Sequence, residues 1–207
     1  MELLQQRSGW LGLNFQDRIR KQNVERLTML TGLVKIEAED LSRTTIVSIG
    51  GGPGDKICQP WFPRIAATTG AKVINFDISQ PDIVDRELGL YEHVGGEYGN
   101  VFNLLGENMD IFHFLNSDDN ISIIECNNMI GNNVSPDIAR IFGWPNDIYA
   151  HPKLIELRSN LIFASQVLLA EGGILAIDNA FWRKDGEQLL PIDKEGYSRR
   201  TVFAGEK

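Results

Sequence analysis

The stretch "IVSIGGGPGD", residues 46–55, decides the fold because it joins a short apolar run to a turn that holds four glycines. The run is rich in β-branched residues and is stopped by glycine, which is typical of a buried strand. A glycine-rich turn after such a strand lets ligand atoms approach the backbone, since no Cβ stands in the way. The stretch therefore predicts a strand, a ligand-binding turn and a following helix.

Further apolar segments alternate with helix-sized intervals along the chain. Strands are expected over residues 44–50, 71–77, 98–104, 120–126, 173–179 and 199–205. Helices are expected over residues 16–33, 104–116 and 154–169, and after the glycines. The helix expected over residues 154–169 carries Leu154, Leu157, Leu161, Ala164 and Leu168 on one face. The alternation predicts βαβ units and therefore a parallel sheet. We expect a doubly wound, mostly parallel α/β sheet of Rossmann-like type, with residues 1–40 forming an N-terminal helical cap.

Charge and composition restrict the classes of function. The net charge of −8 disfavours a nucleic-acid partner, because neutralising phosphates requires a surplus of Lys and Arg. The basic run at residues 18–22 is expected to be the solvated side of a helix. No apolar run reaches the roughly 20 residues that span a bilayer. With no secretory pattern and only Cys58 and Cys126, we expect one cytoplasmic domain, residues 1–207, and no membrane partner.

The fold class predicts where a ligand binds. In doubly wound sheets ligands lie at the carboxyl ends of the strands, near the point where the strand order reverses. Residues at the predicted strand ends are Gly50–Asp55, Asp77, Asn103, Glu125, Asn127, Asn128, Asp178 and Asn179. The polar, turn-rich segment over residues 127–152 is expected to be a lid or an insertion.

The spacing of the glycines favours one cofactor class. A dinucleotide fingerprint, G-x-G-x-x-G, would need glycine at position 55, where Asp55 stands. The spacing Gly50, Gly52, Gly54 instead resembles the first motif of class I S-adenosylmethionine-dependent methyltransferases. That resemblance implies a Rossmann-like methyltransferase fold with the glycine turn, including Gly51, beside the methionine part of the cofactor. The family often has an acidic residue where this chain has Ser48. The alternative is a tight turn without a ligand.

Two further residues are candidate contacts of the same cofactor. Asp77 ends the second predicted strand, and a carboxylate there can accept hydrogen bonds from both hydroxyls of a ribose. Its alternative role is a helix N-cap. The resemblance implies that Asn103, after the third predicted strand, accepts from the adenine amine, whereas its alternative role is a turn residue.

The stretch "LLAEGGILAIDNAFWRKDG", residues 168–186, resembles the fifth-strand region of cation-dependent O-methyltransferases. The resemblance implies that Glu125, Asp178 and Asn179 bind a divalent metal, Mg²⁺, which holds the acceptor's hydroxyls and lowers the pKa of the attacking one. Glu125 is one methylene longer than the family's aspartate. The alternative is that Asp178 and Asn179 shape a strand-end turn or line the acceptor pocket.

The base of such a reaction is left open by the sequence. Asn128 stands where that family has a lysine base, and an amide does not take up a proton at neutral pH. If a base is needed, the candidates are His151 or Tyr149 in the insertion, or Glu125 when no metal is bound.

The favoured hypothesis is a methyltransferase that uses S-adenosylmethionine and a small-molecule acceptor, with oxygen as the favoured accepting atom. The alternative is a non-catalytic S-adenosylmethionine-binding or regulatory module of the same fold. A third hypothesis is a nicotinamide-dependent oxidoreductase, which Asp55 argues against. The N-terminal helix is expected either to cap the active site or to form the face of a homodimer.

Overall fold

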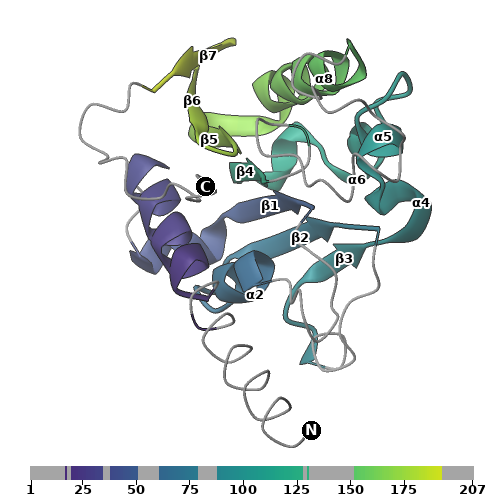
Figure 1. The fold of residues 1–207 in the computed structure, drawn as a ribbon. Coiled ribbons are helices and arrows are strands. Elements are labelled where there is room, and N and C mark those ends of the chain that lie inside the picture. The colour runs from purple at the N-terminus through teal and green to yellow at the C-terminus, as the bar shows by residue number, and fades with distance from the viewer. Residues whose placement is uncertain are drawn as a thin grey trace, which may run out of the picture.

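In a computed structural model the described residues build one seven-stranded mixed sheet with the strand order β3-β2-β1-β4-β5-β6-β7 (Figure 1). The structure describes residues 17, 20–34, 38–50, 61–78, 88–127, 130 and 152–192. The strands are β1 (Thr45–Ile49), β2 (Lys72–Phe76), β3 (Glu92–Val94), β4 (Ile121–Cys126), β5 (Leu169–Ile177), β6 (Ala180–Asp185) and β7 (Gln188–Pro191). Strands β1 to β5 pair in parallel, and β6 and β7 add an antiparallel hairpin ribbon. The strand order reverses between β1 and β4.

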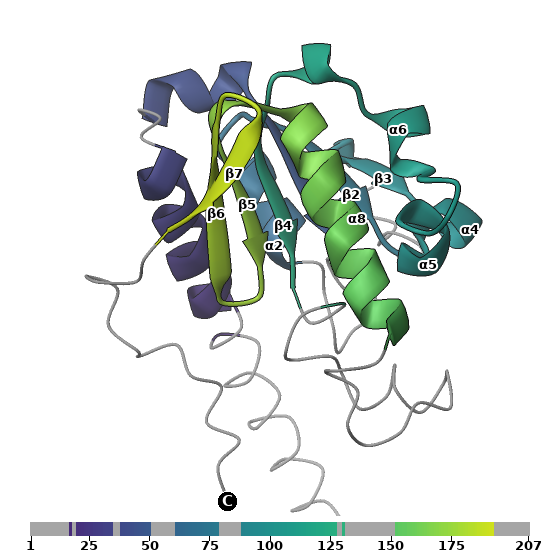
Figure 2. The ribbon, with the colours of Figure 1, turned by 90° about the horizontal axis from the view of Figure 1, so that it is seen from above.

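Helices cover both faces of the sheet. They are a helix over residues 20–34, η1 (Ala38–Arg43), α2 (Trp61–Ala67), α4 (Gly96–Gly99), α5 (Val101–Leu104), α6 (Ile111–Phe114), η2 (Ser117–Asp119) and α8 (Pro152–Leu168). The helix over residues 20–34, called the N-terminal helix below, packs with α2 on one face through Leu27, Leu30 and Phe62. Helix α8 packs on the other face, with α5 and α6 (Figure 2). The N-terminal helix and α8 therefore enclose the sheet between two apolar layers.

Most predicted elements are confirmed. The strands expected over residues 44–50, 71–77, 120–126 and 173–179 correspond to β1, β2, β4 and β5. A helix follows the glycine stretch, as α2, and the N-terminal helix is present over 20–34. The five residues expected on one face of α8 are all buried. The helix expected over 104–116 is reduced to α6 and turns. The α/β class and the parallel centre of the sheet are therefore confirmed.

The strand expected over residues 98–104 is wrong, because this segment forms α4 and α5. The third strand is β3, which lies before it in the sequence. Asn100 starts α5 by accepting a hydrogen bond from the Phe102 N–H (2.9 Å). Val101 and Leu104, which are three positions apart, are both buried, whereas Asn103 is exposed. This spacing of buried residues is that of a helix. An asparagine cap therefore prevails over the β propensity of the aromatic and β-branched residues around it.

The hairpin of β6 and β7 is not among the predicted elements. Its turn contains Gly186 with φ +59°, directly after Asp185, and Asp-Gly is a strong hairpin signal. The strand expected over 199–205 lies outside the described residues, as does most of the segment 127–152.

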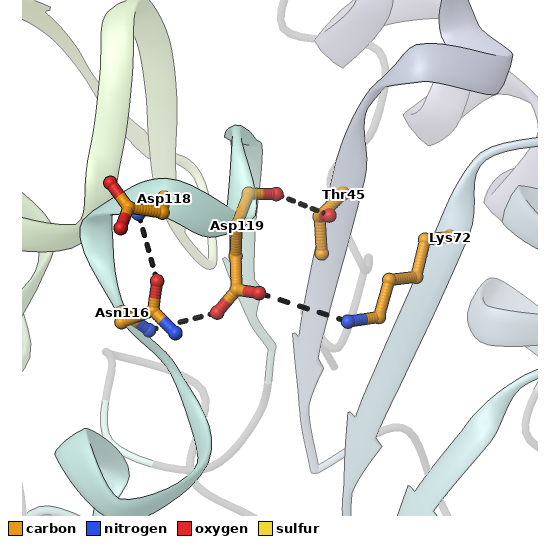
Figure 3. A network of polar contacts seen from close by, with 5 residues as sticks. All are labelled: Thr45, Lys72, Asn116, Asp118 and Asp119. Carbon is orange, nitrogen blue, oxygen red and sulfur yellow. Dashed lines mark hydrogen bonds and ion pairs between the residues drawn. The ribbon is translucent and has the colours of Figure 1, made fainter.

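A polar network anchors the amino end of the sheet (Figure 3). Asn116 and Asp119 cap η2 reciprocally, and Asp118 N–H donates to the Asn116 side chain (2.9 Å). The Thr45 hydroxyl donates to the Asp119 carbonyl (2.6 Å), and Lys72 Nζ lies 3.8 Å from Asp119 Oδ1. The network ties η2 to the first residues of β1 and β2, at the end of the sheet opposite the predicted ligand site.

Among the helices that the structure describes, none has the length and apolar character needed to cross a bilayer.

Candidate functional site

Gly50 and Asp77 lie at neighbouring strand ends. Gly50 follows β1 with φ +74°, a left-handed conformation that favours glycine, and its N–H donates to the Phe76 carbonyl (2.8 Å). Asp77 follows β2, is buried, and its N–H donates to the Val94 carbonyl (3.2 Å). The structure thus places the first glycine of the turn and the candidate ribose acceptor at the same edge. Gly51, Gly52 and Gly54 lie outside the described residues.

The position of Asp77 depends on a close backbone contact with Gly99, the last residue of α4. A Cβ on Gly99 would collide with the Asp77 carbonyl and lie 2.9 Å from the Val94 carbonyl oxygen. Backbone atoms of a strand end cannot move aside as a flexible side chain can, so any larger residue here must displace α4 or β2.

Gly99→Ala is therefore expected to lower the free energy of unfolding by about 1–3 kcal/mol, the usual cost of overpacking. Urea unfolding followed by far-UV circular dichroism measures it. Glu97→Ala, at an exposed position of the same short helix, is the control and should change stability little. Equal stability of Gly99→Ala and the wild type would contradict the close packing at Asp77.

A row of polar side chains crosses four strands just inside the carboxyl edge. His93, Asn75, Ser48 and Glu125 are register partners on β3, β2, β1 and β4. Each is the last residue but one of its strand. Asn75 Nδ2 lies 3.4 Å from His93 Nδ1, while Ser48 Oγ and Asn75 Oδ1 are buried without a hydrogen-bond partner in the part of the chain that the structure describes. Apart from Glu125, this row is not among the predicted site residues, although a polar residue at the same place in the three apolar strands β1, β2 and β4 is a visible signal.

Glu125 is held by an arginine of the N-terminal helix. Arg26 Nε lies 3.4 Å from Glu125 Oε1, and the two side chains are 13% and 4% exposed. The Arg26 guanidinium also lies 5.3 Å from the centroid of the Phe181 ring, within the range of a cation–π contact. The N-terminal helix is further joined to β6, because Arg183 Nη2 donates to the Leu33 carbonyl (2.8 Å). Ser48 and Glu125 thus face this helix.

Burial raises the pKa of Glu125 from its ordinary value of 4.5 to about 7. The positive charge of Arg26 lowers this pKa, and the charge of Asp178 raises it further. The desolvation of the carboxylate exceeds the attraction of the guanidinium, so the neutral and charged forms coexist near neutral pH.

This raised pKa predicts how stability depends on pH. Between pH 4.5 and 7 the folded protein binds more protons at Glu125 than the unfolded chain, so the contribution of Glu125 to stability falls as the pH rises. The fall is about 3 kcal/mol across this window. Urea unfolding of the wild type and Glu125→Gln at several pH values measures it, since the substitution should remove this part of the dependence. Identical pH dependence in both proteins would show that the carboxyl is not desolvated.

Asp178 and Asn179 form the two-residue turn between β5 and β6, where Ile177 pairs with Ala180. Asp178 has φ +49°, which Asp tolerates better than most residues, and its N–H donates to the Cys126 carbonyl (3.0 Å). Asp178 is buried and Asn179 is exposed. These two residues therefore form a strand-end turn, and a metal-binding role for them stays a prediction.

The described residues do not fit a magnesium ion at Glu125. Mg²⁺ needs near-octahedral oxygen ligands at about 2 Å and usually keeps several waters, but this carboxylate is buried against Arg26. A Mg²⁺ ion bound to Glu125 would also be repelled by the Arg26 guanidinium. Two unit charges 4 Å apart interact by about 4 kcal/mol at an effective dielectric constant of about 20, and the repulsion doubles when one of them is divalent. Within the described ranges no cluster of three or more His, Cys, Asp or Glu side chains could hold a metal.

The remaining predicted site residues are Asn103, Asn128, Tyr149 and His151. Asn103 is exposed on α5, and its amide donates to the Glu97 carbonyl (3.0 Å), so its expected place after a strand is wrong. An adenine contact by Asn103 stays a prediction. Asn128, Tyr149 and His151 lie outside the described residues.

Comparisons with protein-family models and with curated proteins find no match to this chain.

Proposed function

We propose that the protein is a methyltransferase that binds S-adenosylmethionine in a Rossmann-like fold and methylates a small molecule, with oxygen as the favoured accepting atom. The observation that carries the proposal is the left-handed Gly50 turn beside the buried carboxylate of Asp77. Both lie at the carboxyl edge of a parallel sheet, next to the reversal of strand order between β1 and β4. Ligands of α/β sheets bind at such points.

The strand order supports this fold and also departs from its usual form. The order 3-2-1-4-5 is that of a doubly wound nucleotide-binding sheet. In place of a sixth parallel strand, β6 pairs with β5 in the antiparallel sense and follows it after two residues. The hairpin keeps the sheet edge continuous without a crossover helix, and it brings Phe181 to Arg26.

The residues at the edge have distinct tasks in this proposal. The Asp77 carboxylate accepts hydrogen bonds from two ribose hydroxyls, and the glycine turn leaves room for the amino-acid part of the cofactor. When bound, S-adenosylmethionine supplies a methyl carbon already activated by its sulfonium. The protein then has to exclude water and hold the acceptor in line, and positioning alone can supply much of the rate.

Transfer of a radiolabelled methyl group to a panel of hydroxyl-, thiol- and amine-bearing small molecules tests the proposal. We expect a labelled hydroxyl-bearing product and no label when the cofactor is replaced by S-adenosylhomocysteine. No product from any acceptor, together with measurable cofactor binding, would favour the second candidate described below.

The second candidate is a binding or regulatory module that holds the cofactor without turnover. It is favoured by the engagement of Glu125: this carboxylate of β4, beside the reversal of strand order, is buried against Arg26. In addition, Ser48 and Asn128 stand where the methyltransferases that the sequence resembles carry charged residues. A module of this kind would bind S-adenosylmethionine with the same residues but would give no labelled product.

A further inference from the structure

Arg26 is placed where it serves as more than a surface cation. It reaches from the N-terminal helix to the last residue but one of β4, and its side chain is 13% exposed. Its Nε atom is buried 3.4 Å from Glu125 Oε1, and its Nη2 atom is buried without a hydrogen-bond partner among the described residues. A buried donor without an acceptor costs stability, so the ion pair with Glu125 is what holds this side chain at the sheet.

Two acidic residues stand at the carboxyl ends of β4 and β5. Glu125 lies on β4, and the charge of Asp178 acts on it from the turn after β5. A divalent metal is one way to balance two carboxylates in a site of this kind, and an arginine is another. In this chain the guanidinium lies 3.4 Å from the Glu125 carboxylate and stacks on Phe181, so it is held from two sides.

We infer that Arg26 is the fixed cation of this edge and takes the place that a divalent metal would have beside Glu125 and Asp178. The positive charge that a metal ion from solution would bring is thus supplied by a side chain of the protein itself. It follows that the N-terminal helix is part of the site, because undocking it would remove the cation. The inference does not depend on methyl transfer, since it concerns only which cation balances Glu125.

Titration with Mn²⁺ tests this inference without any cofactor or acceptor. Mn²⁺ resembles Mg²⁺ in its ligands, and the loss of its free electron-paramagnetic-resonance signal reports binding. At pH 8, where the Glu125 carboxyl with its pKa of about 7 is mostly ionised, the wild type should show no Asp178-dependent binding with a dissociation constant below about 1 mM. Arg26→Gln should bind Mn²⁺ at least about tenfold more tightly, and Arg26→Gln with Asp178→Asn should lose that gain.

Two controls separate this site from other acidic groups on a chain of net charge −8. Arg26→Lys keeps a cation and should show no gain in Mn²⁺ affinity over the wild type, and circular dichroism shows whether each variant is folded. If Arg26→Gln does not fold, the wild type and its Asp178→Asn variant still decide the matter. Wild-type Mn²⁺ binding abolished by Asp178→Asn would overturn the inference, as would a folded Arg26→Gln without any gain in affinity.

Discussion

Replacing Arg26 with methionine is expected to lower the free energy of unfolding by about 3–5 kcal/mol, the usual effect of removing one partner of a buried ion pair. Methionine fills much of the same volume, so the loss comes mainly from leaving the Glu125 carboxylate buried without its cation. The loss should be larger at pH 8 than at pH 5, because Glu125 has a pKa of about 7 in the folded protein. Urea unfolding at the two pH values measures both effects.

Two further variants make this result specific. Arg26→Met combined with Glu125→Leu removes both charges and should recover most of the lost stability, since apolar replacements of buried pairs are often neutral. Lys21→Met changes a lysine of the same helix whose side chain is 78% exposed and 3.9 Å from Glu25, and should cost less than about 1 kcal/mol. A double variant as unstable as Arg26→Met would mean that packing, and not charge, holds this contact.

Asp77→Ala is expected to weaken binding of S-adenosylmethionine by at least about 100-fold. The substitution removes the acceptor of two ribose hydroxyls, and hydrogen bonds to a charged group contribute about 1.5–3 kcal/mol each. Isothermal calorimetry on the folded variant measures the change. Asp185→Ala, an exposed carboxylate at the far end of β6, is the control and should bind as the wild type does.

Because Asp77 is buried, its effect on folding has to be separated from its effect on binding. Asp77→Asn keeps the shape and one acceptor oxygen, so it should bind between the wild type and Asp77→Ala. Unchanged affinity in a folded Asp77→Ala would remove this residue from the binding site.

The central strands were predictable because their composition is dictated by burial on both faces. β1, β2 and β4 are short apolar runs with clear ends, and a parallel sheet follows from the helices between them. The segment around Asn100 was not predicted, since its helix depends on one capping side chain in a β-prone context. The Asp-Gly turn of the last hairpin carried a signal that sequence analysis did not use.

The residues at the strand ends of the candidate site were predictable, whereas the buried contact behind them was not. The positions of Gly50 and Asp77 follow from the rule that ligands lie at the carboxyl ends of parallel strands. The contact between Arg26 and Glu125 joins a surface-looking helix to a distant strand, and no local pattern indicates it. The polar row through Asn75 and Ser48 was within reach of the sequence, because register aligns residues at equal distances from the strand ends.

The most direct test of the account is calorimetric titration of the wild type with S-adenosylmethionine and, separately, with NAD⁺ and NADH, in the presence of Mg²⁺ and then of a chelator. The account predicts binding of S-adenosylmethionine alone, with a dissociation constant in about the micromolar range, and the same affinity with and without Mg²⁺. The absence of heat and of thermal stabilisation with S-adenosylmethionine would contradict it, and the Gly50 turn would then be a structural turn or the site of another ligand.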